Sequence, residues 1–589
     1  MAGPSVTTRS ASSRATFDPA FDALKPSSPR PDGIRDTIES IVVAFILAFV
    51  FRAFLVEAFV IPTGSMAPGL YGQHVQHRCD LCRYPYAFGI REPQRLPDGT
   101  IQAGTLDKVK GFASICPNCG FAEGRNSQLN KDERLIASAG DRILVLKWPY
   151  DIGGDLLGPR RWDVVVFKDP QDGETNFIKR LIGLPGEVLQ ILDGDVYTAS
   201  IEKVDGDILD TLQSEPPVNS PDRPRLSPDQ QDRLARVLKI RRKPAIAQSC
   251  LWMIHYDHDF VPDRQRAESY GYRPPRWEPD GEAACGWDAR MPRVRFDPPD
   301  DSPHRLRLSG RPIHDYYGYN DITAHLGNVE SIFEGSTPVS DVKLSFVLRP
   351  TGGDGYLELR LTKDGITFVA RIEAAGHLEL FRLNADKVPK LLDDGDISAL
   401  IPHGRYRIEF ENVDYRVALR VDGREVLATD DTQYGPDLRQ LIRLGTSGIQ
   451  SEPSVVLTAA DWTLELDHLA VHRDVYYRSD GRLDNASTKG IRNPRAGYPG
   501  WGTARSPTLL RDDPPDYFCM GDNSPQSKDA RLWWEVCPML EYRGDYKLGT
   551  VPGDQLIGRA FFVYWPSGHR LSRETPAIIP NVGRMRLIR

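Results

Sequence analysis

The sequence lacks the features that mark several common classes of protein. Eight cysteines in 589 residues are too few for a disulfide scaffold. The net charge of −7 gives no reason to expect binding to nucleic acid, so we expect no nucleic-acid partner. No uninterrupted apolar run reaches the roughly 20 residues of a membrane-spanning helix. The chain is therefore not expected to be a polytopic membrane protein.

Proline and glycine are abundant, with 47 and 50 residues respectively. Both favour turns, loops and β-structure over long helices. Hydrophobic residues make up 40% of the chain and charged residues 26%, as in an ordinary folded protein. Because 589 residues exceed what one hydrophobic core holds, we expect several domains that are mainly β.

The N-terminal region predicts a membrane anchor. Residues 1–36 are rich in serine, proline and arginine, which indicates a disordered cytoplasmic tail. Apolar residues then dominate 37–60, although Arg52 and Glu57 interrupt them. We expect a single transmembrane or interfacial anchor there, with Arg52 extending its charge to the interface. A buried helix of a soluble domain is the alternative, while a cleaved secretory signal lacks its small-residue site.

Basic residues before this segment predict its orientation. They are Arg9, Arg14, Lys25, Arg30 and Arg35. Because positive charge is retained on the cytoplasmic side, we expect the N-terminus inside and the remaining chain outside. The predicted location is a bacterial-type cytoplasmic (inner) membrane, crossed once, with the catalytic domain on the outer or periplasmic side and membrane lipid as a partner.

A candidate nucleophile follows the predicted anchor. A short β-like run enters the Gly64-Ser65 turn, where the glycine lets the backbone turn sharply and leaves the hydroxyl exposed. Such turns are common, and most have no catalytic role. No histidine stands close to Ser65 in the sequence, so a catalytic serine here needs another base.

Lys179 is the candidate base. It lies in a β-branched segment between Ile178 and Leu181, among short runs that indicate strands of an antiparallel sheet. Burial disfavours the charged form of a lysine, and a neutral amine accepts a proton from serine. A surface lysine on an edge strand is the ordinary alternative.

A third motif, residues 520–531, is a polar loop rich in glycine and Asx residues. In this order the three motifs resemble those of type I signal peptidases, also called leader peptidases. The similarity covers roughly residues 35–72, 134–198 and 515–568, and several further segments within it match in the correct order. The resemblance implies a membrane-bound serine endopeptidase that removes signal peptides from exported preproteins through a Ser/Lys dyad, without a catalytic cofactor.

The resemblance also implies roles for individual residues. Ser65 would be the nucleophile and Lys179 its general base, with the backbone N–H of Ser65 and the hydroxyl of Thr63 as oxyanion donors. Ser527 would orient the lysine amine. The remaining supporting residues are Asp522, Asn523, Asp529 and Arg531. Arg180 is expected to be structural rather than catalytic.

Three departures from the family pattern leave the mechanism intact. Gly69 stands where threonine is frequent, Ser524-Pro525 replaces Arg-Asp, and Ala530 replaces a serine. None removes a chemical group that the reaction needs. They bear on the shape of the substrate cleft.

Four cysteines form two Cys-x-x-Cys pairs, Cys79 with Cys82 and Cys116 with Cys119. Their spacing resembles a zinc ribbon, in which four thiolates coordinate a structural zinc ion tetrahedrally. Two disulfides or free thiols are the alternatives. The pairs Cys250–Cys285 and Cys519–Cys537 are conceivable disulfides with no diagnostic spacing.

Long insertions separate the motifs. We expect a zinc-ribbon-like insertion over 76–125, an irregular insertion over 199–330 and a β-sandwich over 335–480, inserted in a peptidase core over 61–198 and 500–575. Alternating apolar residues such as Val342, Leu344 and Phe346 predict the sandwich strands. This pattern resembles concanavalin-like and laminin-G-like jelly rolls, which implies a glycan or protein ligand, although a spacer without a ligand is an equal alternative.

The expected fold is mainly β, a signal-peptidase-type antiparallel core after one transmembrane helix, with an inserted β-sandwich. Two other functions are the alternatives. A membrane-anchored lectin-like binding protein on an inactive protease scaffold is disfavoured because Ser65, Lys179, Thr63 and Ser527 are all present. A self-cleaving repressor-type regulator would need a DNA-binding helix-turn-helix, where this chain has an apolar segment.

Overall fold

The computed structural model describes residues 33–89, 114–123, 138–152, 154–214, 224–270, 272–280, 285–320, 336–384, 388–445, 451–478, 500–504, 506–533, 535–568, 579 and 581–588. The chain divides into two units, one ending at Leu55 and one beginning at Val56. The first contains helix α1 (Gly33–Val50) and the short η2 (Phe51–Leu55). Within the described residues, no helix combines the length and the apolar character needed to cross a membrane.

The anchor predicted over 37–60 differs from the structure at its C-terminal end. Residues 56–60 are strand β1 (Val56–Val60), which pairs antiparallel with β6 (Arg142–Leu146). Phe59 lies opposite Ile143 in this register. These residues satisfy their backbone groups within a sheet, because β6 offers a matching apolar strand that is distant in the sequence.

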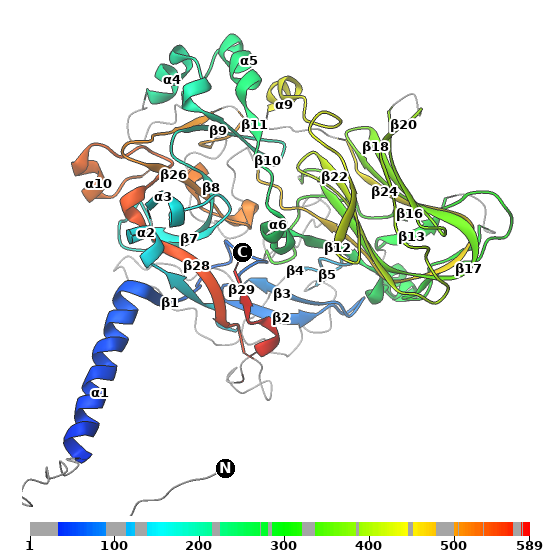
Figure 1. The fold of residues 1–589 in the computed structure, drawn as a ribbon, viewed down its shortest axis with the longest axis horizontal. Coiled ribbons are helices and arrows are strands. Elements are labelled where there is room, and N and C mark those ends of the chain that lie inside the picture. Colours follow the sequence, from blue (N-terminus) through cyan, green and yellow to red (C-terminus); the bar gives the residue numbers. More distant parts are fainter. Residues whose placement is uncertain are drawn as a thin grey trace, which may run out of the picture. The chain divides into compact units, whose positions relative to one another are not determined.

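The first sheet combines strands from both ends of the chain, drawn in blue, cyan and red in Figure 1. Its order is β1-β6-β28-β7-β8-β26-β27, with β29 added beside β28. The remaining strands are β7 (Val164–Lys168), β8 (Asn176–Gly183), β26 (Asp516–Met520), β27 (Val551–Pro552), β28 (Leu556–Trp565) and β29 (Arg586–Leu587). Helices α2 (Trp148–Ile152), α3 (Gly154–Leu157) and α10 (Pro538–Arg543) lie in its connections. The sheet brings β8 beside β26, so motifs more than 300 residues apart meet.

A second sheet has the order β11-β10-β9-β25. Its strands are β9 (Glu187–Leu192), β10 (Asp195–Ser200), β11 (Lys239–Ile240) and β25 (Thr508–Leu510). Helices α4 (Gly206–Gln213), α5 (Pro228–Val237) and α9 (Leu438–Leu444) contribute to its apolar cluster. Their buried leucines pack on Val188 and Tyr197, which explains why these short amphipathic helices are stable.

The insertion predicted to be irregular over 199–330 is largely regular in its described parts, which corrects that prediction. Besides α4 and α5 it contains helices α6 (Ala245–Leu251) and α7 (Arg264–Ser269). Its strands are β12 (Met253–Asp257), β13 (Arg276–Pro279), β14 (Trp287–Asp288), β15 (Val294–Phe296) and β16 (His304–Ser309). These strands belong to the sheet of the sandwich, where Met253 pairs with Arg473. Short strands with partners about 200 residues away carry little local signal.

The β-sandwich is built on two long strands that pair along most of their length, β17 (Val342–Lys363) and β24 (Ser454–Arg473). The first half of β17 pairs with β21 and the second with β18, so both long strands pass from one layer to the other through bulges. The other strands are β18 (Ile366–Glu373), β19 (His377–Leu383), β20 (Pro389–Asp396), β21 (Tyr406–Val413), β22 (Arg416–Val421) and β23 (Arg424–Ala428). The predicted alternation holds, because Val342, Leu344 and Phe346 are buried.

Each Cys-x-x-Cys pair lies at a β-hairpin, which gives the predicted ribbon its structure. The first hairpin is β2 (His74–Arg78) with β3 (Pro85–Gly89), and the second is β4 (Ser114–Ile115) with β5 (Ala122–Glu123). Arg83 N donates to Cys79 O in one knuckle, and Gly120 N donates to Cys116 O in the other. Both donors have positive φ, 66° and 75°. The two knuckles therefore fold alike.

Candidate active site

Ser65 lies in a tight turn that follows β1. Ala67 N donates to Gly64 O at 3.0 Å, and Leu70 N donates to Met66 O at 2.8 Å. Met66 and Ala67 are fully buried, whereas Ser65 keeps 6% of its surface exposed. The apolar residues after the serine thus fix the turn in the core.

Lys179 extends from β8 toward this turn. Its backbone pairs with Val165 of β7, and its side chain is buried with 4% exposure. Lys179 Nζ donates a hydrogen bond to Ser65 Oγ at 2.7 Å. The ring of Phe177 lies 5.0 Å from the same nitrogen. The structure therefore brings together the two residues that the sequence singled out, which are 114 positions apart.

The start of the 520–531 loop connects both residues. Asp522 accepts from Arg180 Nε and Nη2 at 2.7 and 2.8 Å, and both side chains are buried. Asn523 N donates to Ser65 O at 3.0 Å, and its Nδ2 donates to Gly64 O at 3.1 Å. Asp522 thereby braces the strand of Lys179, and Asn523 braces the turn of Ser65.

The end of the loop forms a second buried ion pair. Arg531 Nε and Nη2 donate to the Asp529 carboxylate at 2.8 and 2.7 Å. Asp529 also accepts from Gly521 N, and Arg531 donates to Ser524 Oγ and O. Both residues therefore hold the backbone of the loop.

Ser527 is placed inside the site without a described partner. It is fully buried, and its Oγ has no hydrogen-bond partner among the described residues. A Cβ added at Gly521 would lie 2.3 Å from Ser527 Oγ and 2.4 Å from Ser65 O. Only glycine at 521 lets the loop approach Ser65 this closely. Thr63, the expected oxyanion donor, is partly exposed in the turn of Ser65.

Three residues of the 199–330 insertion also contact the site and were not predicted from the sequence. Asn320 Nδ2 donates to Asn523 Oδ1 at 3.1 Å, and Asn523 Nδ2 donates to Asn320 Oδ1 at 2.7 Å. Tyr317 OH donates to Asp522 O at 2.7 Å, and the Tyr319 ring packs on Gly64. No local pattern in the sequence marks them, because their partners lie about 200 residues away or more.

The four ribbon cysteines converge as a metal site requires. Their sulfur atoms lie within 4.8 Å of one another, with 3.6 Å between Cys79 and Cys119 and between Cys82 and Cys116. A tetrahedral ion with bonds of about 2.3 Å separates its sulfur ligands by about 3.8 Å. A disulfide requires about 2.05 Å, and all eight cysteines are free. The thiolates therefore fit a tetrahedral metal ion, and the disulfides considered from the sequence, including Cys250–Cys285 and Cys519–Cys537, are not formed.

Cys519, a cysteine close to Lys179, has an unreactive thiol. Cys519 is fully buried on β26, opposite Leu181 of β8. Burial raises the pKa of its thiol, although the charge of Lys179 acts in the opposite direction. The thiol is therefore protonated at neutral pH.

Two ranges of the chain match the model of a known protein family. The model described as "Signal peptidase, peptidase S26" matches residues 133–270 and 504–565. These ranges include Lys179 and the whole 520–531 loop. These two ranges of the chain are similar to the signal peptidase family.

Curated signal peptidases I match over short segments. The enzyme of Rickettsia bellii is 42% identical over 52 residues, which are 8% of this chain and 18% of its own length. That of Rickettsia typhi is 51% identical over 39 residues, 7% of this chain and 15% of its own length. The chain thus aligns with less than a fifth of the length of these relatives.

Solved structures align at low similarity. A carbohydrate-binding module from Bacillus subtilis is 13% identical, with a TM-score of 0.22, over 33% of this chain and 94% of its own. Sheep galectin-11 is 11% identical, with a TM-score of 0.16, over 23% of this chain and 92% of its own.

Proposed function

We propose that this protein is a signal peptidase, a serine endopeptidase that removes N-terminal signal peptides from exported preproteins. The contact between Lys179 Nζ and Ser65 Oγ at 2.7 Å carries the proposal. A serine hydroxyl becomes a nucleophile when an adjacent base removes its proton. The relationship to signal peptidases I supplies the substrate class.

The proposed reaction uses groups of the chain itself. Neutral Lys179 takes the Ser65 proton while Oγ attacks the scissile carbonyl, and the protonated amine then gives that proton to the leaving amine. The resulting acyl ester on Ser65 is hydrolysed by a water that Lys179 deprotonates. The backbone N–H of Ser65 and the hydroxyl of Thr63 stabilise the oxyanion, and each such donor is typically worth about 100- to 1000-fold in rate.

The supporting residues keep this geometry in place. Ser527 is proposed to orient the Lys179 amine, because its hydroxyl is buried beside Gly521 and has an unused hydrogen-bonding capacity. Asp522 and Asn523 hold the strand and the turn that carry the two reacting groups. Asp529 and Arg531 hold the loop that contains Ser527.

Membrane attachment is part of the proposal. Helix α1 presents large apolar side chains, with Phe45 and Phe49 exposed at 61% and 67%. Such a surface is favourable when lipid covers it. We propose that the N-terminal segment attaches the enzyme to a cytoplasmic membrane, with the N-terminus inside and the peptidase on the outer side.

The four cysteines are proposed to hold a structural zinc ion. Zinc suits four thiolates in tetrahedral geometry, and binding would stabilise the two knuckles. The ion would have no role in the chemistry at Ser65. Chelation should therefore affect folding of the ribbon before it affects the reacting groups.

A binding role for the sandwich is the second candidate function, as in a lectin-like protein. A groove of about 710 Å³ on its sheet is lined by Arg305, Arg307, Glu358, Arg360 and Phe381, among others. This volume is in the range of ligand sites, which is about 300–1,000 Å³. Planar charged groups beside an aromatic ring suit a glycan or a polar peptide, which would then be a partner of this domain.

Cleavage of a preprotein tests the proposed function. Wild type in detergent or liposomes is expected to cut after a small-residue site, whereas Ser65→Ala and Lys179→Ala should lose activity by about 10⁶-fold while still folded. Ser249→Ala and Lys239→Ala, both exposed, serve as matched controls. A folded wild type that never cuts, or dyad variants that cut normally, would exclude the peptidase and leave the sandwich groove as the place to look.

A further inference from the structure

A second cluster of metal-binding side chains lies in the cysteine ribbon. It consists of His77 from β2, Asp80 from the first knuckle and Glu123 from β5. One ligand atom of each lies within 4.8 Å of the others. His77 Nε2 is 3.6 Å from Glu123 Oε1, and these side chains are 8% and 0% exposed.

Glu123, a member of this cluster, has one carboxylate oxygen whose hydrogen-bonding capacity is unused among the described residues. Its Oε1 accepts from Asp80 N at 2.7 Å, but its Oε2 is buried and has no hydrogen-bond partner among the described residues. A buried carboxylate oxygen without a partner is unfavourable. A cation at this position would remove that penalty.

The charges of the ribbon favour a cation as well. Four thiolates around one divalent ion carry a net charge of about −2, and the carboxylates of Asp80 and Glu123 add to it. Arg266, which lies beside the knuckle, donates to the carbonyl of Asp80 rather than to its carboxylate. The carboxylates of Glu123 and Asp80 thus add two negative charges beside the thiolates, with Arg83 and Arg266 as the arginines that act on Asp80.

We propose that His77, Asp80 and Glu123 bind a divalent transition-metal ion that is separate from the one held by the cysteines. One imidazole and two carboxylates form a mixed nitrogen and oxygen set that suits zinc, cobalt or manganese. Calcium and magnesium select oxygen ligands and are disfavoured by the histidine. The ion would join the two knuckles through residues other than cysteine, across 43 positions of the chain.

Metal stoichiometry tests this site in the full-length protein. Metal-free protein, prepared under reducing conditions, is loaded with Co²⁺ and freed of excess ion. Wild type is expected to bind a second equivalent that adds visible bands of nitrogen- and oxygen-coordinated cobalt to the thiolate charge-transfer band. Glu123→Gln and His77→Gln should each lose that equivalent and retain the thiolate band, which also reports that the ribbon is folded.

Glu268→Gln, at an exposed carboxylate on α7, is the matched control and should bind as wild type does. Binding of a single equivalent by wild type would overturn the proposal. Retention of the second equivalent in both variants would overturn it equally.

A different observation concerns residues 317–320, here named the clamp segment. Asn320 of this segment is hydrogen-bonded to Asn523, which holds the turn of Ser65. Tyr317 is hydrogen-bonded to Asp522, which holds the strand of Lys179. Asn523 in turn bonds Gly64 O and Ser65 O. The Tyr319 ring stacks on Tyr71 at a centroid distance of 5.4 Å.

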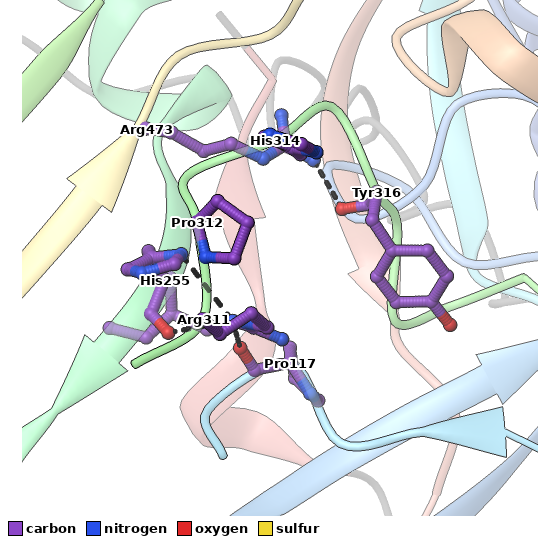
Figure 2. A pocket seen from close by; sticks show the side chains of 8 residues that line it. Pro117, His255, Arg311, Pro312, His314, Tyr316 and Arg473 are labelled. Atoms are coloured by element: carbon purple, nitrogen blue, oxygen red, sulfur yellow. Dashed lines mark hydrogen bonds between the residues drawn. The ribbon is translucent and has the colours of Figure 1, made fainter. Parts of the chain in front are cut away.

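The segment that leads into the clamp is itself fixed. Arg311 donates to Pro117 O at 2.7 Å and to His255 O at 2.9 Å. Figure 2 shows these residues side by side. Arg473 donates to Tyr316 O at 2.5 Å. Gly318 packs so closely on the second knuckle that a Cβ there would lie 3.0 Å from Ile115 O. The clamp segment thus has rigid support from the ribbon and from β24.

We infer that Asn320 is a positioning residue for the reaction at Ser65, an inference that rests on the proposed function. Its amide fixes Asn523 in the orientation that holds the nucleophile turn. A displacement of about 1 Å at a reacting group costs about 100-fold in rate. The expected effect of Asn320→Ala is a fall in kcat of that order, with KM little changed.

Acylation of Ser65 by a serine-directed probe provides a readout independent of substrate binding. Asn320→Ala should slow acylation, Asn320→Gln should recover part of the rate, and Asn384→Ala, exposed in the sandwich, should match wild type. Equal acylation rates in Asn320→Ala and wild type would refute the positioning role of Asn320 and leave the proposed peptidase function intact. No acylation or cleavage by folded wild type would instead refute the proposed peptidase.

Discussion

His74 begins strand β2 shortly after the Ser65 turn and is fully buried. Its Nδ1 lies 2.8 Å from Gly72 O, while the ring packs 4.9 Å from Tyr71. Burial lowers the pKa of His74 from 6.5 to about 4, although the Gly72 carbonyl acts in the opposite direction. The fold therefore holds this imidazole neutral.

A pH dependence of stability follows from His74. Between these pKa values the unfolded chain binds the proton and the folded chain does not, so the stability contribution is lost as the pH falls from about 6.5 to about 4. The expected decrease in the free energy of unfolding is about 2 kcal/mol between about pH 7 and pH 5. Urea denaturation of wild type and His74→Gln measures it, and the variant should show a flatter dependence.

His377→Gln is the control for this measurement. The Asp396 carboxylate raises the pKa of His377, so its contribution has the opposite sign. The decrease toward acid pH should therefore persist in that variant. An unchanged pH dependence in His74→Gln would show that another group is responsible.

Arg180 and Asp522 show how two elements depend on one ion pair. Arg180 follows Lys179 in β8, and Asp522 follows β26. The pair is bidentate, and both side chains are at most 2% exposed. Removing one partner leaves an uncompensated buried charge, which typically costs about 3–5 kcal/mol.

Arg180→Met is therefore expected to lower the free energy of unfolding by about 3–5 kcal/mol. Adding Asp522→Asn should restore part of the loss, because the orphaned charge is removed. Arg264→Met breaks an exposed pair with Glu268 and should cost about 0.5 kcal/mol or less. Chemical denaturation of wild type, Arg180→Met, the double variant and Arg264→Met checks this, and a double variant no more stable than Arg180→Met would contradict the coupling.

Some strands can be predicted from their own local sequence, and others cannot. Strands β17 and β21 were recognisable because alternate residues such as Leu344 and Ile408 are apolar and pack in one core. Strands β13 to β16 were not, because they are short and gain their stability from β24 and from one another. Residues 56–60 were placed in an anchor because an apolar strand and the end of an apolar helix look alike in sequence.

Across the whole molecule, Lys243 links the sandwich to the segment before α6. Its Nζ contacts Asp414, between β21 and β22, and Asp474, directly after β24. All three side chains are buried. This ion triad therefore connects parts of the chain that the sequence separates by more than 170 residues.

Lys243→Met is expected to destabilise the protein by about 3–5 kcal/mol, because two buried carboxylates lose their cation. Lys239→Met, at an exposed position on β11, should change stability by about 0.5 kcal/mol or less. Thermal unfolding compares the two variants. If Lys243→Met is as stable as Lys239→Met, the two buried carboxylates have taken up protons in place of the lysine charge.

The sequence alone indicated a mainly β fold, the candidate pair Ser65 and Lys179 and the four ribbon cysteines, because each depends on residue type, local alternation or motif spacing. Tertiary structure decided which partners those residues meet. It placed Lys179 Nζ at 2.7 Å from Ser65 Oγ and brought Asn320 from the insertion to Asn523. It also gathered His77, Asp80 and Glu123 at the ribbon. Contacts between residues tens to hundreds of positions apart leave no periodic trace in a single sequence, since they arise only when packing brings distant strands together.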